Sequence, residues 1–189
     1  MKTAVYSGSF NPLHIGHLAI IKYLLEEADF GLVHLIVSPK NPLKDGISSS
    51  SGQDRFEAAV AAVARHFSGE SADKVKVDDI ELRMPEPHYT IRTLDALKAQ
   101  ETDKDFTFIL GADNLADIRR WRDYARILNE YGVAVYPREG YNLDEIISDL
   151  KKEDPSYMIQ VLYAPKVDIS STEIREGIAA GKDMSIWLM

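Results

Sequence analysis

The sequence contains no cysteine among its 189 residues. Disulfide bonds, thiolate metal sites and cysteine nucleophiles are therefore all excluded. A chain without cysteine fits a reducing compartment, so we expect a cytoplasmic protein. Any chemistry that this chain performs must use other functional groups.

Long apolar runs and runs of basic residues are also missing. No stretch reaches the roughly 18 consecutive apolar residues of a membrane span, and residues 1–3 lead directly into a short apolar run. We therefore expect neither a membrane segment nor a signal peptide. The 30 acidic residues outnumber the 22 basic ones, and the net charge of −8 argues against a nucleic-acid-binding surface. Small molecules are the expected partners, and a homo-oligomer is a further candidate assembly.

What the sequence does contain is a regular alternation of short apolar runs and amphipathic segments. The expected strands cover residues 3–7, 33–38, 75–78, 106–110, 133–136 and 158–163. The expected helices cover residues 16–28, 55–67, 91–99, 143–151 and 171–180, with an interrupted helical stretch over 115–128. This alternation predicts an α/β fold, a Rossmann-like doubly wound parallel sheet that binds ligands at the carboxyl ends of its strands. The length suits a single domain over residues 1–189, ending in a small helical segment.

Local signals mark some of the helix ends. Asp54 and Glu57 have the spacing of a capping box for the second helix, and Ser170 and Glu173 have it for the last helix. Gly181 is expected to close that last helix, because glycine is common just beyond a helix end.

The segment after the first expected strand reads SGSFNPLHIGH. Gly8 allows a close backbone approach, and the N–H groups near Ser9 and Phe10 can face phosphate oxygens at the start of a helix. His14 and His17 are expected on one face of that helix, where two imidazoles would stabilise negative charge on a triphosphate. The alternative is a histidine pair that only caps a turn, but the strand–glycine–helix setting favours the triphosphate site.

A second segment, after the last expected strand, reads DISSTEIR. It brings the hydroxyl groups of Ser170 and Ser171 to the start of a helix, and a simple N-cap explains one of them. Arg175 is expected in the first turn, where a cation suits the helix dipole only if an anion is bound. Because the carboxyl ends of parallel strands lie at one edge of a sheet, this segment and the two histidines are expected to surround the same triphosphate.

Between these two segments, Gly111 and Asp113 follow the strongly apolar strand expected at 106–110. A carboxylate just beyond a strand end suits hydrogen bonds to ribose hydroxyls, but Asp113 or Asn114 serves equally well as a helix N-cap. Trp121 stands in a polar stretch, so its indole is either a stacking surface or part of the core.

Basic residues in loops after strands are candidates for binding a second phosphate. They are Lys40, Lys44 and Arg138, and a solvated surface charge is the alternative for each. The two lysines belong to a serine-containing stretch, residues 39–53, whose length predicts a mobile loop that could close over the site.

Together these segments resemble the nucleotidyltransferase superfamily, and most closely the bacterial nicotinate mononucleotide adenylyltransferases. The resemblance is carried by the loop 8–17, by the C-terminal signature within 168–181, and by residues 39–44, Tyr89-Thr90, residues 111–114, Trp121 and Pro137-Arg138, all in the family's order. It implies a Rossmann-like enzyme that joins ATP to nicotinate mononucleotide, releasing pyrophosphate and forming the deamido dinucleotide of NAD biosynthesis. The mononucleotide phosphate would attack the α-phosphorus in line, without a covalent enzyme intermediate.

The resemblance also implies roles for individual residues. His14, His17 and Arg175 would be catalytic, and ATP would be bound by Gly8, Ser9, Phe10, Gly111, Asp113, Ile169, Ser170 and Ser171. The mononucleotide would be bound by Lys44, Tyr89, Thr90, Trp121 and Arg138. In this assignment the backbone N–H groups of Tyr89 and Thr90 receive the pyridine carboxylate, and Trp121 stacks on the ring. Mg²⁺ is expected on the ATP phosphates rather than in a protein metal site.

Two features depart from the family pattern. Asn11 stands where an aspartate is common, and the tail over 182–189 ends where a further proline-led helix is expected, so it is either naturally short or cut. The HIGH motif also occurs in class I aminoacyl-tRNA synthetases, but the chain is too short for such an enzyme and lacks a lysine-rich loop before its end. The remaining alternatives are a phosphopantetheine adenylyltransferase and a nucleotide-binding regulatory module without turnover.

Overall fold

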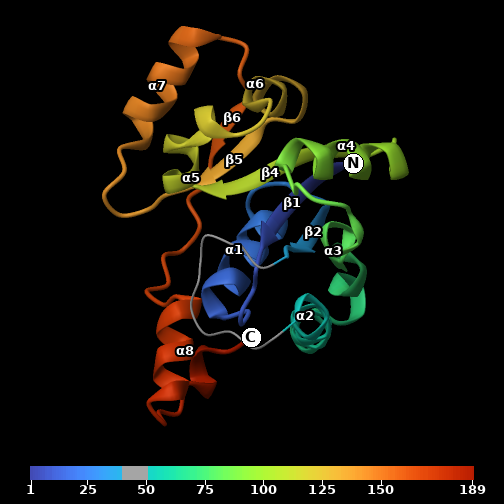
Figure 1. Ribbon diagram of the computed structural model, residues 1–189, viewed down its shortest axis with the longest axis vertical. Helices are drawn as coiled ribbons and strands as arrows, with labels where there is room; N and C mark the ends of the chain where they lie inside the picture. The colour runs from blue at the N-terminus through green and yellow to red at the C-terminus, as the bar shows by residue number, and fades with distance from the viewer. Residues whose placement is uncertain (40–50) are drawn as a thin grey trace. The chain divides into compact units, whose positions relative to one another are not determined.

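A computed structural model describes residues 1–39 and 51–189 of the chain. The described residues form the strands β1 (Lys2–Gly8), β2 (Leu32–Val37), β3 (Val75–Asp78), β4 (Asp105–Gly111), β5 (Val133–Tyr136) and β6 (Ile159–Val161). They make one sheet in the order β3-β2-β1-β4-β5-β6, with parallel pairing in β1–β4, β2–β3, β4–β5 and β5–β6 (Figure 1). The order reverses between β1 and β4, as in the Rossmann fold, so the expected fold class is confirmed.

The central strands are apolar on both faces. All residues of β2 are buried, and in β4 every residue from the fourth onward is buried as well. A parallel sheet covered by helices on both sides produces such continuous apolar runs. These runs explain why the expected strand ends lie within two residues of the observed ones.

Helices connect these strands. The described residues form α1 (Ile15–Glu26), α2 (Gly52–His66), α3 (Ile80–Arg83), α4 (Thr90–Gln100), α5 (Ala112–Ala116), α6 (Tyr124–Arg126), α7 (Leu143–Glu153) and α8 (Ser171–Ala179). The described residues also form the 3₁₀ helices η1 (Gly69–Lys74), η2 (Ile118–Arg120) and η4 (Ser185–Trp187), and the π-helix η3 (Ile127–Tyr131). The interrupted helical stretch is confirmed as the succession α5, η2, α6 and η3. Sequence reasoning missed η1, α3 and η4, because segments of three to six residues are too short to show a helical period.

The observed helix ends correct the capping box expected for α2 and confirm the two signals expected at the ends of α8. The capping box of α2 is made by Ser51 and Asp54, not by Asp54 and Glu57, so the helix begins three residues earlier than expected. The Ser51 hydroxyl accepts from the Asp54 N–H (3.1 Å), and the Asp54 carboxylate accepts from the Ser51 N–H (2.9 Å). Ser170 caps α8, and Gly181 (φ +72°) ends it with the hydrogen bonds of a Schellman motif.

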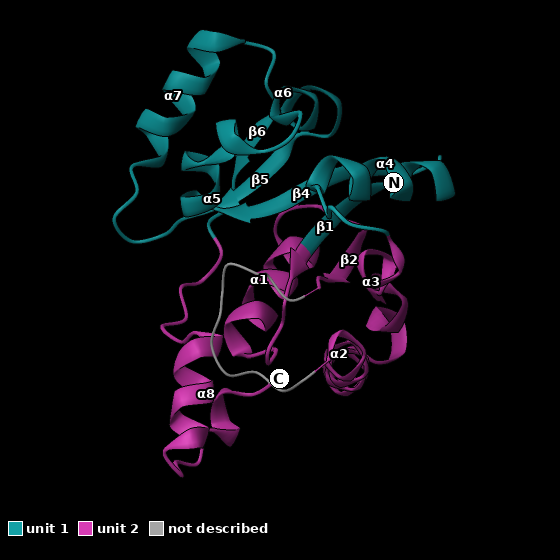
Figure 2. Cartoon of the chain, in the orientation of Figure 1, with its two compact units in different colours: residues 1–6, 85–163 teal, residues 7–84, 164–189 magenta. Residues whose placement is uncertain are grey.

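The chain separates into two compact units (Figure 2). Unit 1 comprises Met1–Tyr6 and Pro85–Tyr163, and unit 2 comprises Ser7–Met84 and Ala164–Met189. Unit 1 therefore holds most of β1, the strands β4 to β6 and the helices α4 to α7, whereas unit 2 holds β2, β3, α1 to α3 and α8. The expectation of one domain over the whole chain stays a prediction.

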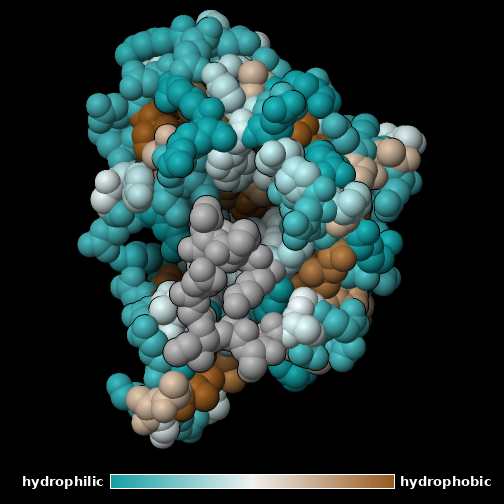
Figure 3. Space-filling model, in the orientation of Figure 1, coloured by the Kyte–Doolittle hydropathy of each residue, from teal (hydrophilic) through white to brown (hydrophobic). Residues whose placement is uncertain are grey.

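The face shown in Figure 3 is mostly hydrophilic. An apolar area lies over α8 and the residues after it, where Ile178, Ile186 and Leu188 are exposed. Among the described residues, every helix is too short or too polar to cross a lipid bilayer.

Candidate active site

The first loop of unit 2 begins where β1 ends, at Gly8. Phe10 has φ +43°, in the left-handed region that an aromatic residue rarely adopts, so surrounding contacts must hold it there. Its ring is buried and lies 3.1 Å from the point where a Cβ at Gly8 would stand. A Cβ at Gly8 would therefore press on the Phe10 ring, so glycine suits the packing of this loop. The expected close approach of Gly8 to phosphate stays a prediction.

Helix α8 contacts this loop through two side chains of the C-terminal signature. The Ser171 hydroxyl donates to the Pro12 carbonyl (3.0 Å), and Arg175 Nη1 donates to the Asn11 carbonyl (2.7 Å). The expected convergence of these two distant segments is therefore observed within unit 2. Arg175 is the fifth residue of α8, so the expectation that it lies in the first turn is wrong by one residue.

The other two predicted residues of this signature have local partners. The Ser170 hydroxyl accepts from the Glu173 N–H (3.2 Å) and donates to the Glu173 carboxylate (2.6 Å), as a helix cap. The Ile169 N–H donates to the Val167 carbonyl (2.9 Å). These contacts fix the start of α8, which carries Ser171 and Arg175, and the expected role of both residues in binding ATP stays a prediction.

The C-terminal residues lie against the other end of the loop. Leu188 forms an antiparallel bridge with His14, and the Met189 N–H approaches the Leu13 carbonyl at 3.4 Å. Arg65 of α2 donates to the Met189 carbonyl (2.7 Å). The segment from Asn11 to His14 is thus held by its backbone on both sides.

His14 and His17 make a capping box for α1 with their side chains. His14 Nδ1 accepts from the Gly16 N–H (3.2 Å), and His17 Nδ1 accepts from the His14 N–H (3.1 Å). The ring centroids are 3.7 Å apart, and the rings are tilted by 36°. Because each Nδ1 accepts a hydrogen bond, the proton of each neutral imidazole belongs on Nε2. The histidines therefore do cap the helix through Nδ1, and the same contacts leave Nε2–H as the donor of each neutral ring.

Unit 1 brings together Gly111, Asp113 and Arg138 at the carboxyl ends of β4 and β5. Asp113 Oδ1 is buried and accepts no hydrogen bond from the described residues, although Arg138 Nε lies 3.8 Å away. A Cβ at Gly111 would stand 2.4 Å from that Oδ1 and 3.2 Å from Arg138 Nε. Gly111 itself is the N-cap of α5, so the alternative role of Asp113 or Asn114 as N-cap is wrong. An unsatisfied carboxylate oxygen here suits a ligand hydroxyl.

Two tyrosines that sequence reasoning missed complete this cluster. The Arg138 guanidinium lies 4.9 Å from the centroid of the Tyr136 ring, and Tyr6 meets Tyr136 edge to face at 6.4 Å. Burial, followed by the nearby Tyr136, raises the pKa of the Tyr6 hydroxyl well above its ordinary value, so the hydroxyl stays neutral. Both tyrosines occupy strand positions where an aromatic residue is expected in the core, so no sequence pattern indicated a role in this cluster.

Tyr89 and Trp121 lie on two other elements of unit 1. Tyr89 is the N-cap residue of α4, which has no side-chain cap and no acidic residue in its first turn. The Tyr89 N–H donates to the Pro87 carbonyl (3.1 Å) and is therefore already paired. The N–H groups of Thr90 and of the residue after it are among those that the start of a helix leaves without a partner inside the helix. Trp121 is partly exposed and meets Phe108 edge to face at 5.9 Å.

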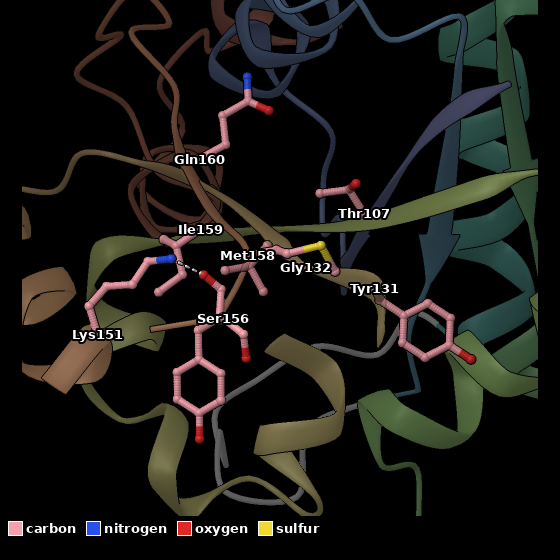
Figure 4. Close-up of a pocket in the computed structure, with 10 residues that line it drawn as sticks. Thr107, Tyr131, Gly132, Lys151, Ser156, Met158, Ile159 and Gln160 are labelled. Carbon is pink, nitrogen blue, oxygen red and sulfur yellow. Dashed lines mark hydrogen bonds between the residues drawn. The ribbon is translucent and has the colours of Figure 1, made fainter. Parts of the chain in front are cut away.

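An open cavity of about 400 Å³ lies elsewhere in unit 1 (Figure 4). Its lining includes Val133 and Ile159, which begin β5 and β6, so it is at the amino ends of these strands. The Lys151 ammonium beside it donates to the carbonyls of Pro155 and Tyr157. None of the predicted site residues lines this cavity, and Gly111 and Arg138 stand at or just beyond the opposite, carboxyl ends of β4 and β5.

Lys44 lies outside the described residues, so its expected role is not addressed. Within the described ranges, no group of three or more histidine or carboxylate side chains is placed to hold a metal ion. The residues described here therefore offer donors for anions, a carboxylate for hydroxyls and an aromatic surface.

Known proteins are similar to this sequence along its length. A family model of cytidylyltransferase-like proteins matches residues 5–177. A probable nicotinate-nucleotide adenylyltransferase from Flavobacterium johnsoniae is 38% identical over 184 residues, covering 97% of this chain and 90% of that protein. One from Bacteroides fragilis is 37% identical over 187 residues, covering 99% of this chain and 87% of that protein. The chain belongs to the nicotinate-nucleotide adenylyltransferase family.

Membership in this adenylyltransferase family confirms the resemblance that the motifs indicated. Among solved structures, Plasmodium falciparum nicotinic acid mononucleotide adenylyltransferase complexed with NaAD matches with a TM-score of 0.75 and 20% identity, covering 99% of this chain and 90% of that one. At this identity the likeness shows the fold, which agrees with the strand order described above.

Proposed function

We propose that this protein transfers AMP from ATP to nicotinate mononucleotide, producing nicotinate adenine dinucleotide and pyrophosphate. Relatives named for this activity match this chain over 97% or more of its length. The observation that carries the proposal within the structure is the histidine pair at the start of α1, with both Nδ1 atoms accepting backbone N–H groups. An activity based on charge stabilisation suits a chain that has no cysteine nucleophile.

ATP is assigned to the first loop of unit 2. The Nε2–H groups of His14 and His17 would donate to phosphate oxygens as the acceptor oxygen bonds to the α-phosphorus, the bond to the bridging oxygen breaks, and negative charge develops on the leaving pyrophosphate. Arg175 adds a permanent positive charge from α8, and its contact with the Asn11 carbonyl fixes it against the loop. No proton has to leave the acceptor, because a phosphate monoester is already an anionic nucleophile near neutral pH.

The mononucleotide is assigned to Lys44 and to residues of unit 1. The uncapped start of α4 at Thr90 would receive the pyridine carboxylate, because its unpaired N–H groups and helix dipole favour an anion. The partly exposed Trp121 offers a surface for the ring. Arg138 and Lys44 are the proposed partners of the mononucleotide phosphate, and Asp113 Oδ1 is the proposed acceptor for a ribose hydroxyl of ATP.

Mg²⁺ fits this assignment as a companion of ATP. Mg²⁺ is commonly held by substrate phosphates and water with few protein ligands, and the described residues contain no cluster of ligands that would compete. When bound, it would neutralise charge on the phosphates. A cytoplasmic location and a homo-oligomeric assembly are further proposals, the first resting on the cysteine-free composition.

A pyrophosphate-release assay with ATP, Mg²⁺ and a panel of acceptors tests the proposed function. The panel contains nicotinate mononucleotide, nicotinamide mononucleotide and phosphopantetheine. We expect release of pyrophosphate with nicotinate mononucleotide and formation of the dinucleotide. Turnover of phosphopantetheine alone would assign the chain to a different transferase, and ATP binding without turnover of any acceptor would support a regulatory module instead.

A further inference from the structure

Arg55, the fourth residue of α2, is a buried arginine that forms no ion pair with the described residues. Only 5% of its surface is exposed. Burial lowers the pKa of its guanidinium below the ordinary value. The side chain nevertheless stays protonated throughout the physiological range, as arginine does in proteins. A buried cation is costly unless it is hydrogen-bonded, so the contacts of this side chain require an explanation.

One nitrogen of this guanidinium bridges two strand ends. Arg55 Nη1 donates to the Ser9 carbonyl (2.5 Å) in the first loop and to the Ser38 carbonyl (2.8 Å) just after β2. The Ser38 N–H donates to the Gly8 carbonyl (2.9 Å), and the hydroxyls of Ser7 and Ser38 lie 2.7 Å apart. The chain segments that leave β1 and β2 are therefore joined to each other and to α2 at one point.

The contact with Ser9 determines the orientation of the peptide group between Ser9 and Phe10. In a trans peptide the carbonyl and the following N–H point in opposite directions. Because the Ser9 carbonyl points at Arg55, the Phe10 N–H points away from it. This orientation must be imposed by contacts, since Phe10 has the unfavourable φ of +43°.

The same contact places positive charge behind the loop. The other side chains that hold the loop contact its later carbonyls, at Asn11 and Pro12. Arg55 alone among these side chains holds Ser9, where the sequence predicts N–H groups that face phosphate. A cation that is poorly screened by water and has no acidic partner in the described residues raises the local potential for an anion.

We propose that Arg55 is a positioning residue for triphosphate binding: it orients the Ser9–Phe10 peptide and adds buried positive charge behind it. This inference rests on the proposed function, in which this loop binds ATP. Arg55 does not touch the reacting atoms in this scheme. It acts through the loop, so its loss should affect ATP and leave the mononucleotide unaffected.

The test compares Arg55→Met and Arg55→Lys with Lys98→Met in the full chain. Lys98 is a matched control, because its ammonium also joins two backbone carbonyls, those of Thr102 (2.9 Å) and Lys104 (2.6 Å), but at the far end of α4. For each variant we would measure thermal unfolding, binding of ATP and of adenosine by calorimetry, and steady-state kinetics with each substrate varied in turn.

For Arg55→Met we expect ATP affinity to fall by roughly tenfold or more, since hydrogen bonds from a charged donor are lost. The KM for ATP should rise and kcat should fall, while adenosine affinity and the KM for the mononucleotide at saturating ATP change by less than about twofold. Arg55→Lys should recover part of the ATP affinity, because it keeps the charge. Lys98→Met should lower the unfolding temperature without changing either KM.

A purely structural role gives a different pattern. If Arg55→Met lowers kcat through a smaller folded fraction and leaves ATP affinity and both KM values unchanged, the proposal is wrong. If Arg55→Met does not fold, Arg55→Lys decides the question by the same comparison of KM for ATP with KM for the mononucleotide. If the unmodified protein binds ATP but releases no pyrophosphate with any acceptor, the proposed function fails, and ATP calorimetry on the Arg55 variants still tests this inference.

Discussion

The starts of α1 and α4 satisfy their backbone N–H groups in different ways. At α1, the imidazoles of His14 and His17 accept N–H groups of the helix start, so side chains occupy part of the natural anion site. At α4, no side chain caps the helix and no acidic residue stands in the first turn. The first helix thus offers Nε2–H groups in place of some backbone donors, whereas the second keeps backbone donors for a ligand.

This difference suits two different anions. A carboxylate is small, planar and unchanged during the proposed reaction, so fixed backbone N–H groups at α4 are sufficient to bind it. A triphosphate changes its charge distribution as the α–β bond breaks, and imidazole donors aimed at that change stabilise the transition state selectively. The comparison predicts that substitutions at the start of α1 lower kcat. It also predicts that substitutions at the start of α4 change the preference between acceptors.

The largest effect is expected at His17. His17→Ala should lower kcat by about 10²–10³-fold while the KM for ATP changes little, because a donor to developing charge is lost. His17→Asn is the informative companion, since its side-chain oxygen can replace Nδ1 as the cap but nothing replaces Nε2–H. We expect it to recover thermal stability and not kcat, in unfolding and pyrophosphate-release assays. Recovery of kcat by His17→Asn would show that His17 acts only as a helix cap.

The next effect concerns the acceptor at α4. The unmodified protein should prefer nicotinate over nicotinamide mononucleotide by roughly tenfold or more in kcat/KM, because backbone N–H donors match a carboxylate and leave an amide NH₂ unmatched. Tyr89→Asp would give α4 the side-chain cap that it lacks. Like charges placed together cost several kcal/mol, so this variant should lose about tenfold or more in kcat/KM for the acid.

The Tyr89→Asp variant should also retain or improve its thermal stability, since aspartate is a good N-cap residue. Activity with the amide should change less than activity with the acid, when both mononucleotides are compared at saturating ATP. Equal losses with both acceptors would indicate a general disturbance of α4. They would contradict the proposal that the start of this helix binds the pyridine carboxylate.

A smaller effect is expected at Trp121. Trp121→Ala should raise the KM for nicotinate mononucleotide by about tenfold, because stacking of one aromatic surface contributes on the order of 1 kcal/mol beyond area burial. The KM for ATP should stay unchanged. Trp121→Phe keeps an aromatic face and should restore most of the affinity. Unfolding measurements check that loss of the contact with Phe108 has not caused the change.

The smallest functional effect is expected at an ordinary helix cap. The Asn142 side chain accepts from the Glu145 N–H at the start of α7 (3.3 Å), and Asn142 itself is not one of the proposed site residues. Asn142→Ala should destabilise the protein by about 1 kcal/mol in denaturant unfolding and leave kcat and both KM values unchanged. A kinetic change here would weaken the distinction between structural caps and the histidine cap of α1.

The strands and the long helices were predictable because their apolar patterns are continuous and strong. Val133–Tyr136 and Val75–Asp78 match the expected strand ends, and the interrupted pattern after β4 is a succession of short helices. The start of α2 was misplaced, since Asp54 can open one capping box or complete another, and the sequence does not say which. Only the structure shows that Ser51 is the cap.

The candidate site was predictable where residue type carries the chemistry, as with the two histidines. It was not predictable where the acceptor is a backbone carbonyl, because every residue has one and no pattern distinguishes it. The contacts of Arg55 with Ser9 and of Arg175 with Asn11 are of this kind. The role of Tyr136 beneath Arg138 was missed for a related reason, since a strand aromatic is ordinarily a core residue.

The backbone anchoring of the first loop has a thermodynamic consequence. Its carbonyls at Ser9, Asn11 and Pro12 are each held by a side chain from α2 or α8. The conformational entropy of this loop is therefore lost once, when the chain folds, and need not be lost again at each catalytic cycle. Successive ATP molecules meet a surface that is already in the conformation that binds them.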